Sequence, residues 1–171
     1  MIMADKGRVA RYQADRTNQK FYFCRLACKQ AGETTDKQLY QAHCETAIFH
    51  LQGALLAFLQ ELAYFYNLDT SAPSIEYIEK ALHNKTLISP ELQRIKLSLE
   101  SGVLANITKA YQRCQYAPAP DSTGMDTSTH DLIVNVVTLS NQWLPDEQTI
   151  REWRGEFMSL IDEMRGGMVE Y

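Results

Sequence analysis

Apolar residues recur along most of this chain at intervals of three and four positions, the spacing that places them on one face of an α-helix. In the most apolar part, Cys44, Ile48, Leu51 and Leu55 form one such stripe. The predicted helices cover about residues 6–30, 36–67, 74–85, 90–114 and 146–165. The Ser-Gly pair at 101–102 is expected to kink or divide the fourth of them, because glycine lowers helix propensity.

Residues with capping properties mark the ends of these helices. Thr-Thr-Asp at 34–36 offers N-caps for the second helix, and Ser-Pro-Glu at 89–91 combines an N-cap, an N1 proline and an acid in the first turn. Glycine tolerates positive φ, so Gly32 is expected to end the first helix and the glycine pair at 166–167 the last. The short connection at 31–35 predicts that the first two helices pack as an antiparallel pair.

One stretch departs from the helical pattern. Residues 117–131 are rich in Pro, Asp, Ser, Thr and Gly, and are expected to form a mobile loop. Residues 132–139 are rich in β-branched side chains, but one strand without a partner cannot form a sheet, so an extended or weakly helical segment lying on the bundle is expected. The chain is therefore predicted to be all-α, a single domain (1–171) built as a bundle of four to five helices with a long loop before the last helix.

The composition fits a globular domain of intracellular type. The chain has 171 residues, 45% of them hydrophobic, and can bury a core without disulfides or metal ions. No apolar run of signal-peptide length occurs near the N-terminus, which favours a cytoplasmic location. The four cysteines are then expected to be free thiols in a reducing compartment that serve as small core residues. They are Cys24, Cys28, Cys44 and Cys114.

The most apolar stretch, Ala47–Tyr66, is expected to be buried in the bundle rather than in a membrane. It contains a histidine, two glutamines and a glutamate, which a bilayer span of about 20 residues tolerates poorly. Phe49 and Leu56 add apolar surface outside the main stripe, and a helix that is apolar on several faces belongs in the middle of a bundle. Gly53 costs ~1 kcal/mol in helix propensity, which close packing against a neighbour would offset.

Charge is distributed unevenly along the chain. The net charge is −4, but the first 30 residues contain seven basic and two acidic residues, so they carry +5 and the remainder carries −9. A chain with this balance has no general affinity for nucleic acid. The basic first helix is expected to pack onto acidic residues of the same fold, and the alternative is that it presents an anion-binding surface.

No motif in the sequence specifies a reaction. A carboxylate-bridged di-metal bundle needs Glu-x-x-His on facing helices, whereas Tyr40 and Ala47 stand three positions before His43 and His50. These histidines are about 10 Å apart along a helix, too far for one ion to bind both. The sequence also lacks a phosphate-binding glycine loop and the His-Glu-x-x-His and Gly-x-Ser-x-Gly motifs. We therefore predict no catalytic residue, no metal site and no cofactor.

One polar cluster is a candidate binding site. Arg16 and Lys20 fall on the apolar side of the first helix, so they must extend to solvent, form ion pairs or hold an anion. In an antiparallel pair whose turn centres near residue 33, Arg16 lies level with His50, and Phe23 lies level with His43. These positions predict a semi-buried polar site between the two helices.

The predicted ligand of this site is a small anion or a carboxylate from a partner. Its residues are Arg16, Lys20 and His50, with Asn18, Gln19 or His43 nearby. The alternative is an internal network in which Glu45 or Glu61 neutralises the two cations and fixes the register of the helices.

Four segments of the sequence carry a likeness to known proteins. They are the run Arg16–Lys20 followed by Phe23 and Leu26, the run Ala47–Leu55, the helix start Ser89–Leu92, and the closing Gly167–Tyr171. These segments resemble a bacterial family of uncharacterised all-helical proteins, a domain of unknown function, over most of the chain except residues 117–131. The resemblance implies a cytosolic all-helical protein and no particular activity.

A second, weaker likeness lies in the second helix, which is similar to helical nucleotidyltransferase-partner domains. Ribonucleases of that kind use an Arg followed four to six residues later by a His. No arginine of this chain has a histidine at that distance, so the ribonuclease activity is not expected.

The sequence therefore favours a non-enzymatic helical module that binds a protein partner or a small anionic ligand. Its nine tyrosines and two tryptophans supply surface for protein contacts, including self-association into a homodimer. The alternative is a nucleotide- or nucleic-acid-associated helical domain that uses the basic first helix. The two differ in salt dependence, because phosphate binding weakens steeply as salt rises. Neither involves a membrane.

Overall fold

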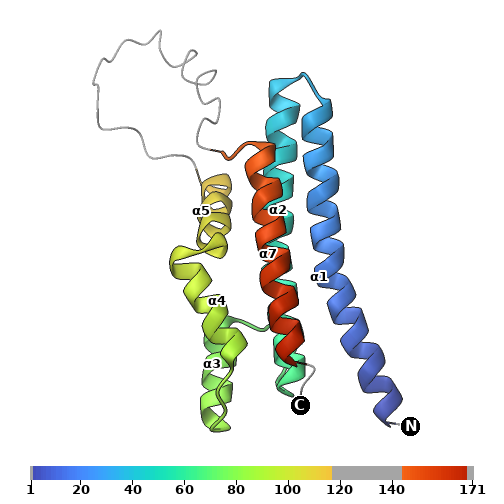
Figure 1. The fold of residues 1–171 in the computed structure, drawn as a ribbon, viewed down its shortest axis with the longest axis vertical. Helices are drawn as coiled ribbons and strands as arrows, with labels where there is room; N and C mark the ends of the chain where they lie inside the picture. Colours follow the sequence, from blue (N-terminus) through green and yellow to red (C-terminus); the bar gives the residue numbers. More distant parts are fainter. Residues whose placement is uncertain (1, 117–143, 169–171) are drawn as a thin grey trace.

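The computed structural model describes residues 2–116 and 144–168, with side chains from residue 11 onward except that of Tyr12. The predicted loop 117–131 and the segment 132–139 lie outside these ranges. Within them the structure is helical and contains no strand, which confirms the predicted fold class (Figure 1). The helices are α1 Ile2–Glu33, α2 Lys37–Phe65, α3 Ile75–Asn84, α4 Pro90–Ser101, α5 Val103–Gln115 and α7 Glu147–Met168.

The helices α1 and α2 form a long antiparallel hairpin. Asp36 is the N-cap of α2, because its Oδ1 accepts the backbone N–H groups of Gln38 and Leu39 at 2.8 and 3.0 Å. The prediction that Gly32 ends α1 was wrong, since the helix continues for one more residue. The glycine instead gives room to α7: a Cβ at this position would lie 3.2 Å from Oε1 of Glu147.

The C-terminus of α2 lies two residues before the predicted end. The helix ends at Phe65, and Asn67 takes a left-handed conformation with φ 55°. The N–H of Leu68 then donates to the carbonyl of Ala63 at 2.8 Å. This is a Schellman motif, in which asparagine replaces the usual glycine.

The predicted fourth helix is divided at Gly102. The backbone there is extended (φ −106°, ψ −162°) and separates α4 from α5. A Cβ at this junction would lie 2.9 Å from the Cα of Ser98, so glycine is required for the close approach. The division brings the helices of the described ranges to six.

The last helix starts as predicted and ends later. Asp146 accepts the N–H of Thr149 at 2.8 Å and thereby caps α7. The glycine pair at 166–167 does not end the helix, which continues to Met168. Glycine lowers helix propensity only by ~1 kcal/mol, so one more turn is tolerated.

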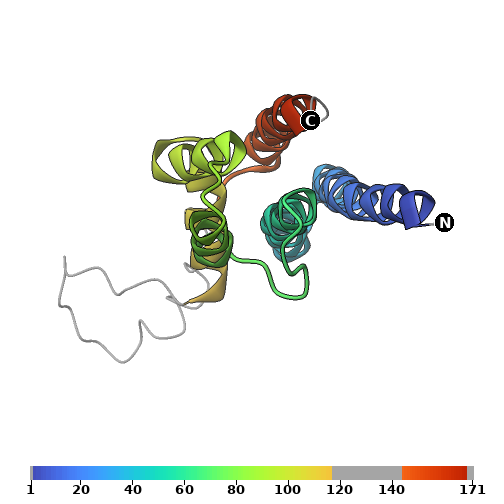
Figure 2. The same cartoon turned by 90° about the horizontal axis from the view of Figure 1, so that it is seen from below.

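Helix α2 is the centre of the bundle. It packs against α1, α5 and α7, and α1 also packs against α7 (Figures 1 and 2). Its predicted stripe is buried from Cys44 to Leu62, and Phe65 is half-buried. Across the core, the rings of Phe21 in α1 and Phe157 in α7 meet edge to face with centroids 5.1 Å apart. The hydrophobic core therefore lies between α1, α2, α5 and α7, and it extends to buried residues of α3 and α4.

The central helix α2 is unusually apolar. By length and composition alone, α2 is apolar enough to cross a membrane, and half of its most apolar window is buried inside the bundle. A central core helix has the same properties.

All four cysteines are free, three of them buried and Cys114 half-buried, which confirms their predicted role as core thiols.

Candidate functional site

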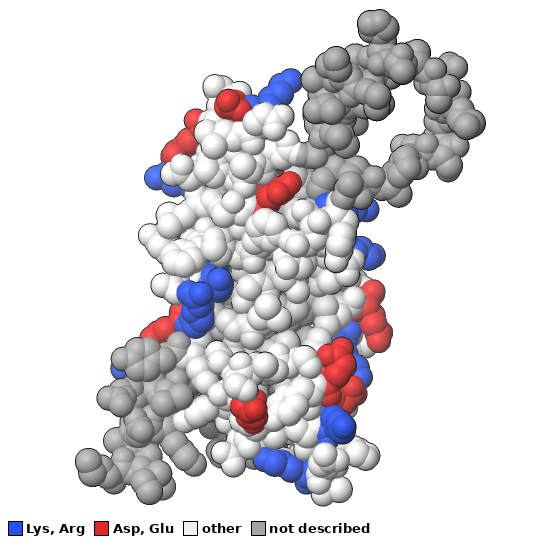
Figure 3. All heavy atoms as spheres, turned by 180° about the vertical axis from the view of Figure 1, so that it is seen from behind, with Lys and Arg blue, Asp and Glu red and all other residues white. Residues whose placement is uncertain are grey.

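The side of α2 that faces away from the other described helices is mostly uncharged, and its one acidic neighbour, Glu45, is half-buried at the border with α5. This outer face consists of Leu39, Ala42, Thr46, Phe49, Gly53, Leu56, Ala57 and Gln60. Its large apolar residues Leu39, Phe49 and Leu56 are 47%, 38% and 55% exposed. Seen from behind, the molecule shows a broad, mostly uncharged surface with a few separate acidic side chains and with basic side chains toward one edge (Figure 3). The expectation that α2 is enclosed was therefore wrong for this side.

Two consecutive residues of α2 point to the two borders of the outer face. The ring of Phe49 meets that of Tyr111 in α5 edge to face, with centroids 5.6 Å apart. The imidazole of His50 meets the ring of Phe23 in α1, with centroids 5.3 Å apart. The outer face is thus bordered by aromatic contacts to α5 on one side and to α1 on the other.

Lys20 reaches from α1 onto the centre of the outer face. A Cβ at Gly53 would lie 3.2 Å from Cδ and Cε of Lys20 and 3.3 Å from its Nζ, so the lysine stem lies directly over the glycine. This is the close packing that was expected to offset the low helix propensity of Gly53. Lys20 therefore covers apolar surface with its stem while its ammonium group stays partly in solvent.

Arg16, Lys20 and His50, here called the Lys20 cluster, gather positive charge at this border. Burial, and then the charge of Arg16, lowers the pKa of Lys20. Burial also lowers the pKa of His50, followed by the charges of Lys20 and Arg16. Among the described residues, no carboxylate forms an ion pair with Arg16 or Lys20. The Lys20 cluster is therefore an electropositive spot on an otherwise uncharged face.

The other three predicted site residues are placed differently. Gln19 is next to the cluster, since its Oε1 accepts a hydrogen bond from Nη1 of Arg16 at 2.5 Å. Asn18 points to α7, where its Oδ1 accepts from Nη1 of Arg165 at 3.0 Å. His43 is half-buried on α2, and in the described part of the chain no hydrogen bond or ring contact joins it to the cluster.

The register of the hairpin also differs from the predicted one. Phe23, rather than Arg16, lies level with His50, and Lys20 lies level with Gly53. The shift corresponds to about two helical turns. Part of its cause is the longer α1, which moves the turn from residue 33 to residues 34–36.

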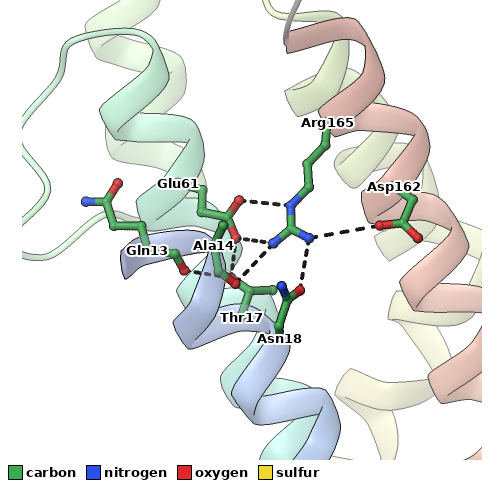
Figure 4. A network of polar contacts seen from close by, with 7 residues as sticks. All are labelled: Gln13, Ala14, Thr17, Asn18, Glu61, Asp162 and Arg165. Carbon is green, nitrogen blue, oxygen red and sulfur yellow. Dashed lines mark hydrogen bonds and ion pairs between the residues drawn. The ribbon is translucent and has the colours of Figure 1, made fainter. Parts of the chain in front are cut away.

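A buried ion pair joins α1, α2 and α7 near the cluster (Figure 4). Arg165 donates from Nη2 and Nε to the two carboxylate oxygens of Glu61, at 2.7 and 3.0 Å. The hydroxyl of Thr17, which is fully buried, donates to the same carboxylate. Glu61 is thus occupied by Arg165 and does not neutralise Arg16 or Lys20, contrary to the alternative prediction.

Glu45, the other predicted partner of the two cations, lies on the α5 side of α2. Its charge raises the pKa of the Cys114 thiol in α5, after the larger effect of burial. Burial raises the pKa of Glu45 itself. An internal polar network therefore exists, but it is built on Arg165, a residue that the sequence did not mark because its partner lies 104 positions away.

The buried thiols form a separate cluster in the hairpin. A hydrogen bond between Cys24 and Cys28 raises the pKa of Cys24 and lowers that of Cys28. Burial raises the pKa of Cys44 to about 11. In the ranges that the structure describes, no group of three or more His, Cys, Asp or Glu side chains has the arrangement of a metal site. Buried thiols of this kind are inert core residues.

A hollow of about 480 Å³ lies between α3 and α4, away from the Lys20 cluster. Its lining includes the apolar side chains of Leu82, Leu92 and Leu97. The charges of Glu79 and Lys96 at its rim form an ion pair at 2.5 Å. His83 and Glu100 also line the hollow, so its lining carries two carboxylates and one ammonium group.

Comparison with known proteins agrees with the resemblance seen in the sequence. No curated protein and no solved structure matches this chain. Residues 12–171 match the family of unknown function DUF6586, a range that includes the outer face and the whole Lys20 cluster. The chain therefore belongs to the family of unknown function DUF6586.

Proposed function

We propose that this chain is a non-enzymatic interaction module that binds a protein partner on the outer face of α2. The observation that carries the proposal is the exposed, uncharged surface on the central helix of the bundle. Folded domains rarely leave large apolar side chains together in solvent, and such patches mark interaction sites. Leu56, 55% exposed, and Phe49, 38% exposed, lie about two helical turns apart on this surface.

The borders of the outer face have the composition of a protein interface. Interfaces are enriched in aromatic residues and arginine, and their centres are depleted in acidic residues and lysine. Phe49 and Tyr111 form one border, while Phe23 and His50 form the other, beside Arg16. Lys20 is the exception at the centre, and its charge therefore bears on which partner fits.

A second copy of this chain is a less suitable occupant of the face. In a twofold dimer that crosses α2 on α2 at Gly53, the two Lys20 ammonium groups would meet near the axis. Like charges brought together at an interface oppose association by several kcal/mol. The charge of Lys20 therefore favours a different protein as the partner.

The proposal is tested by photo-crosslinking in cells of the native host. A benzophenone amino acid replaces Leu56 on the outer face in one variant and Leu97 on α4 in a matched control. Leu97 is an equally apolar residue and is 63% exposed. The expected result is an adduct with one defined protein from position 56 and not from position 97.

The crosslinked protein is then purified and its affinity measured. Leu56→Glu is expected to weaken binding at least about tenfold, because it places a charge in a desolvated contact. Leu97→Glu is expected to leave the affinity unchanged. The same adducts from both positions, or no protein adduct from position 56, would overturn the proposed function.

A further inference from the structure

We propose that the partner contributes an amphipathic α-helix and that an Asp or Glu of this helix forms an ion pair with Lys20 and Arg16. The inference rests on the proposed function, because it names the chemistry of the partner that binds the same face. Three features support it: the dimensions of the outer face, the position of the Lys20 cluster, and the lack of an ion pair to that cluster among the described residues.

The outer face has the dimensions of a helix. From Leu39 to Gln60, α2 rises about 32 Å, which matches an approaching helix of about 20 residues. Small residues along the face, including Ala42 and Ala57, allow two helix axes to approach closely. Figure 2 shows α7 covering the opposite side of the α1–α2 hairpin. A partner helix on the outer face would cover the remaining side of α2.

Lys20 determines the sign of the charge that the partner brings. Its ammonium group lies over Gly53, near the middle of the face, so an approaching helix removes water from it. A desolvated ammonium group without a counter-charge strongly opposes binding. Because no carboxylate among the described residues pairs with Lys20 or Arg16, we assign the counter-charge to the partner. A carboxylate also suits the guanidinium of Arg16, which can donate two parallel hydrogen bonds.

The charges on the two sides of α2 also orient the partner helix. Arg16 and Lys20 lie on the α1 side, whereas Glu45 lies half-buried toward α5, close to Cys114. A carboxylate on the partner is attracted to the first side and repelled from the second. The acidic flank of the bound helix therefore faces α1, and its apolar stripe covers Phe49 and Leu56.

A display library of amphipathic helical peptides provides the test. The library keeps one Leu/Ala face and randomises the flanking positions among Asp, Glu, Lys, Arg and Gln. It is selected against the full chain, against Lys20→Met, which keeps the stem over Gly53, and against the double variant R16E/K20E. The control is K37E/K80E, which reverses two exposed lysines away from the outer face. Circular dichroism and thermal unfolding establish that each variant is folded.

The expected result is enrichment of Asp or Glu on one flank with the wild-type chain. These peptides should bind Lys20→Met about tenfold more weakly than the wild-type chain. Selection against R16E/K20E should instead enrich Lys or Arg on the same flank. Selection against K37E/K80E should give the same peptides as the wild-type chain. Peptides that require Leu56 but show no acidic preference would overturn this inference and leave the proposed function standing. A library that yields no peptide weakened by Leu56→Glu would overturn both.

A lipid surface could also present anions to an apolar face. Sedimentation with vesicles of phosphatidylcholine and phosphatidylglycerol distinguishes such a surface from a peptide ligand. No sedimentation of the chain with these vesicles is expected. Sedimentation that is lost in both Lys20→Met and Leu56→Glu would overturn the inference, because the outer face would then bind anionic lipid.

Discussion

The stem of Lys20 in α1 crosses the bare Cα of Gly53 in α2, with Cδ and Cε 3.2 Å from the position that a Cβ would take. A long flexible cation on one helix and the smallest residue on the other therefore form one packing unit. This unit is one of many contacts between α1 and α2, and it sets an ammonium group on the outer face of α2. Packing and candidate binding chemistry thus depend on the same two residues.

Gly53→Ala is expected to stabilise the protein. Alanine gains up to ~1 kcal/mol in helix propensity over glycine, and the flexible stem of Lys20 can move by the few tenths of an ångström that the new Cβ requires. Urea unfolding measures the change, and the double variant with Lys20→Ala, in which nothing has to move, is the control. Destabilisation in the single variant would show that the stem of Lys20 is rigidly held.

Arg165→Met is expected to destabilise the protein by about 3 kcal/mol, because it leaves the buried carboxylate of Glu61 without a cation. The side chains of Glu61 and Arg165 are only 8% and 23% exposed. Adding Glu61→Gln should recover part of the loss, since it removes the unpaired charge. Chemical denaturation of the two single variants and the double variant measures the coupling. A loss below ~0.5 kcal/mol for Arg165→Met would mean that water replaces the ion pair.

Acidification is expected to destabilise the protein through His50. Its folded-state pKa lies below the ordinary 6.5 because of burial and the charges of Lys20 and Arg16. The unfolded chain then binds the proton more readily, so stability is full above pH 6.5, falls as the pH drops toward the folded-state pKa, and levels below it. NMR titration of His50 measures this pKa, and Lys20→Met should raise it toward 6.5. A wild-type midpoint at or above 6.5 would contradict the placement of the cluster.

The thiols are expected to resist alkylation in the folded protein. Cys24, Cys28 and Cys44 are at most 1% exposed, and burial raises the pKa of Cys44 to about 11 and that of Cys114 to about 12. Mass spectrometry after iodoacetamide treatment should show slow labelling of half-buried Cys114 and labelling of the other three only in denaturant. Rapid labelling of Cys28 in the native state would show that its lowered pKa, rather than its burial, controls its reactivity.

Local patterns in the sequence were sufficient to predict most of the helices. Asp36 and Ser89 act as predicted N-caps, and the last helix begins next to Asp146, as predicted. The glycine predictions were less successful: Gly32 is tolerated inside α1 and gives room to α7, whereas Gly102 does divide a helix. Whether a glycine ends a helix or gives room to a neighbouring helix depends on what packs against it. The residues next to it in the sequence do not determine that contact.

The candidate site was predictable in composition but not in geometry. Lys20 stood out as a cation on an apolar helix face, and the structure places it beside Arg16 and His50. The contact between Lys20 and Gly53 was not predicted, because the register of the hairpin depends on where the turn lies. The pairing of Glu61 with Arg165 was missed because it depends on how α7 returns to the hairpin.

Carbene footprinting of the chain, purified and then added to an extract of native host cells, tests the central claim most directly. The account predicts that Leu56 and Phe49 are labelled readily in the purified chain and become protected in the extract, while Leu97 and Ile88, also exposed, stay labelled in both. Leu56 that is already protected in the purified chain, or that remains equally labelled in both samples, would contradict the claim that the outer face of α2 binds a partner.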